Sequence, residues 1–108
     1  MEFRHREAVR ERWFTFSLFE QLGNIGGEVH RALRSRHTDQ KLFASAVDRA
    51  LELFDLTLQD PRWRGGRVRE IARAREVFCD AVSGGTEYNS SLEDLDRYFL
   101  QFALVARR

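Results

Sequence analysis

The sequence predicts an all-α fold, a single-domain antiparallel four-helix bundle with a short N-terminal extension. Apolar residues recur at spacings of three and four along four segments, the periodicity of helices that bury one face. The 108 residues include one proline, which argues against an all-β or loop-rich design, and 43% are hydrophobic, which excludes disorder as the main state. The single cysteine, Cys79, cannot form an internal disulfide, so the core must hold the chain together.

The N-terminal extension is expected to span residues 1–16. Its first twelve residues are expected to fray, and its aromatic side chains are expected to dock on the bundle: Trp13, Phe14 and Phe16. The bundle itself is expected over residues 17–108. Its first helix is predicted at about 17–36, because Ser17 and Glu20 have the spacing of a capping box.

The remaining helices are delimited by proline, glycine and serine. The second is predicted at about 39–59 and ends before Pro61, since the residue preceding a proline disfavours helical geometry. The third is predicted at about 66–82, between two glycine pairs. A loop over 86–89 leads to the fourth helix, at about 91–106, with Ser90 and Glu93 as a second capping box. Because the connections are short, neighbouring helices are expected to pack antiparallel.

Two helices have more apolar residues than one buried face requires. Leu53 and Leu56 lie outside the main apolar stripe of the second helix, as does Leu42. Leu100 and Leu104 lie four residues apart on the far face of the last helix. Isolated surface leucines are one explanation. We favour a second interface, most simply an isologous homodimer.

The first bundle helix contains three glycines within five residues: Gly23, Gly26 and Gly27. Each glycine inside a helix costs about 1 kcal/mol relative to alanine, so the cluster needs a structural reason. The favoured explanation is the close approach of another helix. The alternative is a shallow groove with His30 at its end, which makes His30 a binding candidate.

Arg75 falls within the apolar arc of the third helix. A buried guanidinium needs a carboxylate partner, because an unpaired buried charge is strongly destabilising. Asp55 and Asp48 are the expected partners, with Glu28 as a further candidate. We favour an interior salt bridge, and the alternative is an anion-binding site formed by Arg75 and Asp55.

The net charge of +1 conceals two oppositely charged segments. Residues 61–75 contain six arginines against one glutamate, and residues 76–96 contain six acidic residues and no basic one. A basic patch is therefore predicted, with Trp63 beside it, and it consists of Arg62, Arg64, Arg67, Arg69 and Arg73. One interpretation is a nucleic-acid site in which the arginines contact phosphates and Trp63 stacks on a base. Nucleic-acid-binding domains are usually strongly basic as a whole, so pairing with the acidic segment is the favoured explanation.

Several stretches resemble a family of small all-helical prokaryotic proteins without an assigned activity. They include Trp13 to Ala32, Arg49 to Thr57 and Tyr88 to Ser91. The spacing of Arg31 and His37 is also similar to the Arg-x(4–6)-His motif of HEPN-type helical bundles, many of which are ribonucleases. That second resemblance implies Arg31 and His37 as catalytic residues, although Ala32 stands where those proteins usually have a polar residue.

No cofactor or metal site is expected. The only copy of a di-iron Glu-x-x-His motif, Glu2 to His5, lies in the extension, and Cys79 lacks the partner of a nucleophile. The N-terminal segment has no apolar stretch typical of a signal peptide, and no apolar run is long enough to span a membrane, so a cytoplasmic protein is expected. The sequence therefore favours a non-enzymatic interaction or adaptor module that acts as a homodimer, with another protein as a candidate second partner. The alternative is an RNA-binding or HEPN-type ribonuclease-like protein.

Overall fold

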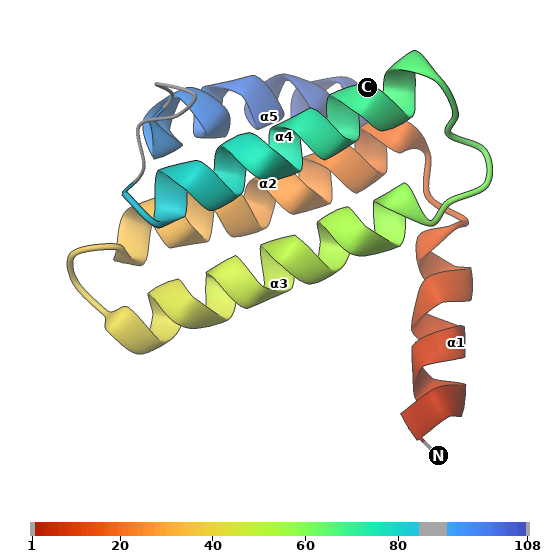
Figure 1. The fold of residues 1–108 in the computed structure, drawn as a ribbon, viewed down its shortest axis with the longest axis horizontal. Helices are drawn as coiled ribbons and strands as arrows, with labels where there is room; N and C mark the ends of the chain where they lie inside the picture. The colour runs from red at the N-terminus through yellow and green to blue at the C-terminus, as the bar shows by residue number, and fades with distance from the viewer. Residues whose placement is uncertain (1, 85–90, 108) are drawn as a thin grey trace.

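The computed structural model describes residues 2–84 and 91–107, with side chains from Arg6 onward. These residues form five helices and no strand: α1 (Glu2–Trp13), α2 (Leu18–Ser35), α3 (Gln40–Leu58), α4 (Gly66–Val82) and α5 (Leu92–Ala106) (Figure 1). The all-α prediction is confirmed, and each of the four expected helices begins and ends within one residue of its predicted bounds. The expected loop at 86–89 and Ser90 lie outside the described residues.

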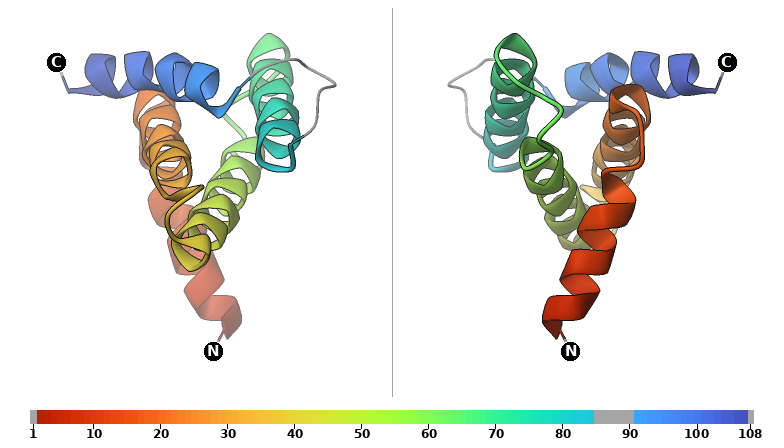
Figure 2. Two further views of the ribbon diagram at one scale, coloured as in Figure 1. Left: turned by 90° about the vertical axis from the view of Figure 1, so that its left-hand side faces the viewer. Right: turned by 90° about the vertical axis from the view of Figure 1, so that its right-hand side faces the viewer.

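Helix α2 makes the most contacts with other helices. Consecutive helices from α2 to α5 alternate in direction along the long axis of the molecule (Figure 1). The most extensive contacts join α2 to α3 and to α5, whereas α4 packs mainly on α3 and touches α5 less. Figure 2 shows α5 lying obliquely across α2 rather than alongside it. This crossing leaves the flanks and outer side of α5 largely uncovered by the other described helices.

Polar side chains fix where the helices begin. Ser17 accepts a hydrogen bond from the Glu20 backbone while the Glu20 side chain accepts one from Ser17, so the predicted capping box is confirmed. Asp39 caps α3. The second capping box lies one residue later than predicted, at Ser91 and Asp94, which places Leu92 and Leu95 on the buried side of α5. Gly65 precedes α4 with a φ of +62°, a conformation that favours glycine.

Residues 2–12 differ from the prediction, because they continue into an ordered helix instead of fraying. This helix, α1, points away from the other four (Figure 1). Trp13 at its end is buried, as expected, and donates a hydrogen bond from its indole Nε1 to Thr57 Oγ1 at 2.9 Å. Helix α1 is therefore anchored at its last residue.

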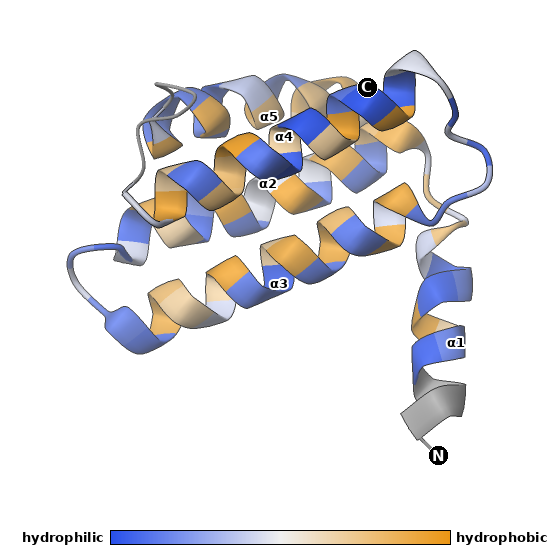
Figure 3. Ribbon diagram, viewed as in Figure 1, coloured by the Kyte–Doolittle hydropathy of each residue, from blue (hydrophilic) through white to orange (hydrophobic). Residues whose placement is uncertain are grey.

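The core lies between the inward faces of α2–α5, where the hydrophobic residues gather (Figure 3). Phe54 of α3 is fully buried and contacts two other buried rings, Phe78 at 5.9 Å and Phe99 at 5.8 Å between ring centroids. Ile25 and Val29 of α2 are also fully buried. Helices α2 to α5 thus share one continuous core of aromatic and branched side chains.

Candidate functional site

The exposed large apolar side chains gather at α5. Leu100, Leu104 and Val105 are 55%, 54% and 41% exposed, and Phe19 at the start of α2 is 45% exposed and stacks on Phe102 of α5. The fifth exposed large apolar residue in the described chain, Leu42, lies on α3. We call Leu100, Leu104 and Val105 the α5 surface.

Two glycines of α2 determine how α5 is held. A Cβ atom at Gly26 would lie 2.6 Å from the Cβ of Phe99, and one at Gly23 would lie 3.0 Å from the Ala103 Cα. Neither position can hold a larger residue unless α5 moves away. The predicted close helix approach is confirmed for Gly23 and Gly26.

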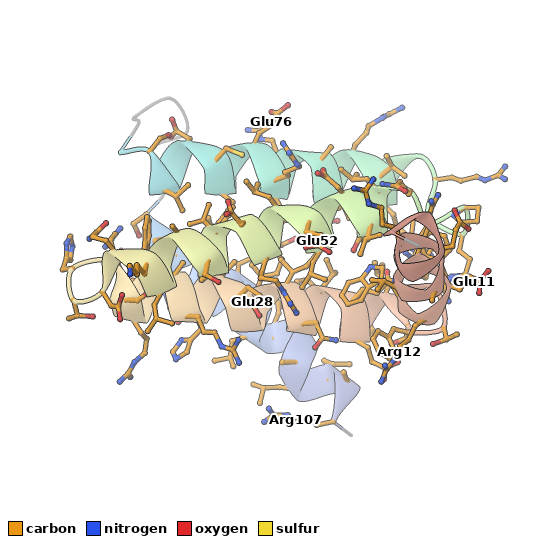
Figure 4. The ribbon with its side chains drawn as sticks, turned by 90° about the horizontal axis from the view of Figure 1, so that it is seen from below. Glu11, Arg12, Glu28, Glu52, Glu76 and Arg107 are labelled. Atoms are coloured by element: carbon orange, nitrogen blue, oxygen red, sulfur yellow. The ribbon has the colours of Figure 1, made fainter. Side chains whose placement is uncertain are left out.

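Gly27 has a different environment, because no atom lies within 4 Å of a Cβ placed there. It borders a shallow cleft of about 290 Å³ between α2 and α5, together with Leu100, Ala103 and Arg107. At the same cleft His30 Nδ1 lies 3.0 Å from Asp96 Oδ1, so His30 joins α2 to α5 through a hydrogen bond. Figure 4 shows Arg107 at the end of α5, on the opposite side of the molecule from Glu76 of α4.

Leu53 and Leu56, the other predicted interface residues, are not on an open surface. Both are half-buried and pack against the core. Leu56 also borders a cleft with Val9 of α1. Their exposure was predicted from a bundle in which α3 buries a single face, but α3 is covered by α1, α2 and α4.

Arg75 pairs with Asp55, one of its predicted partners, with the Arg75 Nε 2.9 Å from Asp55 Oδ1. The prediction of an interior pair is wrong, because the two side chains are 34% and 52% exposed. The guanidinium lies at the edge of the contact between α3 and α4, where water still reaches it. Such a pair contributes little to stability.

The buried ion pair is at Asp60, which the sequence indicated only as the end of a helix. Its carboxylate is 0% exposed and accepts hydrogen bonds from Arg62 Nη2 at 2.7 Å and Nε at 3.0 Å and from Gln21 Nε2 at 3.0 Å. Burial by itself would raise the pKa of the Asp60 carboxyl, but the hydrogen bonds from Arg62 and Gln21 outweigh it and hold the pKa below its ordinary value. Trp63 donates to Gln21 Oε1 at 2.8 Å and completes the network.

This network contains one residue of the predicted basic patch, Arg62, and its neighbour Trp63. Arg62 is held by Asp60 and by the Phe16 carbonyl oxygen, and its guanidinium lies 4.5 Å from the centre of the Trp63 ring. Arg67 lies over the same ring at 5.9 Å. The other members are exposed: Arg64, Arg69 and Arg73. The structure thus assigns Arg62 and Trp63 to holding the loop between α3 and α4 in place.

The side chains of α4 and α5 are linked through Tyr98, whose hydroxyl donates to Glu70 Oε1 at 2.6 Å. Burial of Tyr98, reinforced by the bond to Glu70, raises the pKa of the phenol. An apolar cleft of about 390 Å³ lies beside this bond and is bordered by Phe19, Phe102 and Ile71. This bond is a polar contact at the side of α5 that faces α4.

A further cleft, of about 620 Å³, lies between α2 and α3. Arg31 and Arg34 of α2 and Arg49 of α3 border it, and Glu28 lies on the side of α2 that faces α3 (Figure 4). Arg31 is thus placed at a cleft, while His37 lies exposed on the turn after α2 and is not among the residues that border it. The sequence missed Arg34 and Arg49 as possible binding residues. The spacing of Arg31 and Arg34 was visible, but Arg49 joins them only through the packing of α3.

In residues 2–84 and 91–107, no group of three or more His, Cys, Asp or Glu side chains is placed to hold a metal ion. Within the same residues, no helix combines the length and the apolar character needed to cross a membrane. No protein-family model, curated protein or solved structure matches the chain. The resemblance to small helical prokaryotic proteins therefore stays a prediction, and the function must be inferred from geometry.

Proposed function

We propose that the chain is a non-enzymatic protein-interaction module that acts as a homodimer through α5, on an antiparallel four-helix scaffold. The observation that supports this most strongly is the α5 surface, where three large apolar side chains are about half exposed on one helix. Single exposed leucines are ordinary, but Leu100 and Leu104 lie four residues apart on one side of α5, and neighbouring exposed apolar side chains are typical of an interaction site.

The sequence of α5 favours a second copy of the chain as the occupant. Residues 98–106 contain no charged side chain, although 32% of the chain is charged. An isologous contact brings equivalent surfaces together, so an uncharged centre avoids like-charge repulsion. The beginning of α5 has a net negative charge, with Glu93, Asp94 and Asp96 against Arg97, and Arg107 follows its end. Antiparallel pairing of two α5 helices would therefore bring opposite charges together at both ends of the interface.

The cleft beside Gly27 gives such a dimer a place for side chains. Its volume of about 290 Å³ is more than a leucine side chain needs, and Leu100 forms one of its walls. A leucine from the second copy would contact Leu100, Ala103 and the helix backbone exposed at Gly27, with the polar residues at the border of the cleft: His30, Asp96 and Arg107. Burial of such side chains contributes about 1–2 kcal/mol each.

The test is the oligomeric state of the Leu100→Gln/Leu104→Gln variant, measured by sedimentation equilibrium from 1 to 100 μM. We expect the unsubstituted chain to be dimeric at micromolar concentration. The double substitution removes four leucines from each dimer and is expected to weaken association at least about 100-fold. Both side chains are more than half exposed, so the helical circular dichroism spectrum should not change.

Leu42→Gln is the matched control, because Leu42 is 59% exposed and lies on α3, away from α5. It should leave the dimer intact. A monomeric unsubstituted chain at 100 μM would contradict the proposal, and so would equal weakening by Leu42→Gln.

A further inference from the structure

The cleft between α2 and α3 has a marked excess of positive charge. Its ionised lining residues are three arginines and Glu28, which leaves a net charge of +2. Glu28 is 8% exposed and accepts a hydrogen bond from Arg31 Nη1 at 3.2 Å. That bond holds one guanidinium nitrogen of Arg31, Nη1, beside the cleft. The other guanidinium nitrogens of Arg31 are then available to a ligand.

Arg34 and Arg49 lack carboxylate partners within the described part of the chain. They border the same cleft from different helices, Arg34 from α2 and Arg49 from α3. This distinguishes them from Arg36, Arg62 and Arg75, which pair with Glu93, Asp60 and Asp55. Two unpaired guanidinium groups at one cleft are the feature that an anionic ligand would neutralise.

The cleft also has an apolar wall. Leu42, Ser45, Ala46 and Arg49 follow one face of α3 at spacings of three and four, so methyl groups and a hydroxyl lie beside the guanidinium groups. Its volume of about 620 Å³ is within the usual range of small-molecule sites, roughly 300–1,000 Å³. The cleft therefore has room for an anionic group joined to an apolar or aromatic body.

We propose that this cleft binds a small phosphate monoester, with Arg34 and Arg49 as the phosphate ligands and Arg31 as a third contact positioned by Glu28. A phosphate monoester has a charge of about −1.5 to −2 at pH 7, which matches the excess of the cleft better than a single carboxylate does. Guanidinium groups also bind phosphate oxygens in a bidentate manner. Leu100, Leu104 and Val105 of the α5 surface do not border this cleft, although His30 borders both this cleft and the one beside Gly27.

The experiment is isothermal titration calorimetry at 20 mM NaCl and pH 7.5 with adenosine monophosphate, adenosine and inorganic phosphate as probes. We expect the monophosphate to bind with a dissociation constant below about 1 mM. Adenosine should not bind, because it lacks the charged group. Inorganic phosphate should bind more weakly than the monophosphate, since it makes no contact with the apolar wall.

The variant Arg34→Gln/Arg49→Gln is expected to weaken binding of the monophosphate at least about tenfold. Its matched control is Arg64→Gln/Arg69→Gln, which removes the same charge from exposed arginines outside the cleft and should bind normally. Equal losses in both variants would overturn the proposal, because they would show unspecific attraction. Absence of saturable binding up to 5 mM, or binding of a single-stranded RNA oligomer but not of the monophosphate, would overturn it as well.

Discussion

At the scale of single residues, two adjacent glycines of α2 have opposite roles. Gly26 faces α5, where its missing side chain lets Phe99 approach the α2 backbone. Gly27 faces open space, so its side chain could be larger at no steric cost. The same residue type therefore reflects close packing at one position and an unfilled cleft at the next.

Gly26→Ala and Gly27→Ala are accordingly expected to change stability in opposite directions. Alanine at Gly26 would place a Cβ 2.6 Å from that of Phe99 and should lower the free energy of unfolding by about 2 kcal/mol, as overpacked cores do. Alanine at Gly27 should raise it by about 0.5–1 kcal/mol through its higher helix propensity. Urea unfolding measures both, in the Leu100→Gln/Leu104→Gln background so that self-association does not contribute. Stabilisation by both substitutions would contradict the packing of α5 on Gly26.

At the scale of helices, the ends of three elements are joined by one buried polar network. Gln21 of α2 donates to the Trp13 carbonyl oxygen of α1 at 2.9 Å and to Asp60, just after α3. Arg62 adds a bond to the Phe16 carbonyl oxygen. These contacts fix where α1, α2 and α3 meet, and they satisfy polar groups that would otherwise be buried without partners.

Two aspartate-to-asparagine substitutions test which ion pair stabilises the fold. Asp60→Asn is expected to lower the free energy of unfolding at pH 7 by about 2 kcal/mol. The reason is that Arg62 and Gln21 lose the buried carboxylate to which they donate hydrogen bonds. Asp55→Asn, at the exposed pair with Arg75, should change it by less than about 0.5 kcal/mol. Urea unfolding at pH 7 distinguishes them, and equal effects would contradict the network.

The pH dependence of Asp60→Asn follows from the lowered pKa of Asp60. A carboxyl group whose folded pKa is depressed stabilises the fold fully above its unfolded pKa of about 3.9, and that stability is lost as pH falls through the folded value. The stability difference between the unsubstituted chain and Asp60→Asn should therefore be constant from pH 7 to about 5 and shrink below pH 4.

At the scale of the whole molecule, α1 contributes mainly through its last residue. Trp13 is 6% exposed, whereas none of the residues from Arg6 to Arg12 is buried. Helix α1 makes its main helix contact with α3 and points away from the other helices (Figure 1). The remaining helices share a core that does not include residues 6–12.

Removal of residues 1–11 is therefore expected to lower the free energy of unfolding by less than about 1 kcal/mol, because it exposes little buried surface. Trp13→Ala should lower it by about 3 kcal/mol or more, through the lost ring and the lost hydrogen bond from its indole to Thr57 Oγ1. Thermal unfolding followed by circular dichroism measures both changes. A shortened chain as unstable as Trp13→Ala would assign α1 a larger role.

The sequence predicted the helices well because their signals are local. Apolar periodicity, the Ser17 cap and Pro61 act within a few residues, so they placed the helix bounds closely. The predicted burial of Arg75 and exposure of Leu53 and Leu56 depended on how helices pack, and they were wrong. An apolar arc shows which residues are suited to burial, but the number of neighbouring helices decides which are buried.

By itself, the sequence determined an all-α chain, its four main helices and the surplus of leucine on α5. Only the tertiary structure decided that α5 crosses α2 over Gly23 and Gly26 and that Asp60 carries the buried ion pair. It also brought Arg49 beside Arg31 and Arg34 at one cleft. Helix formation depends on residues three or four positions apart, whereas these contacts join residues separated by tens of positions, whose distances are set by the packing of the whole chain.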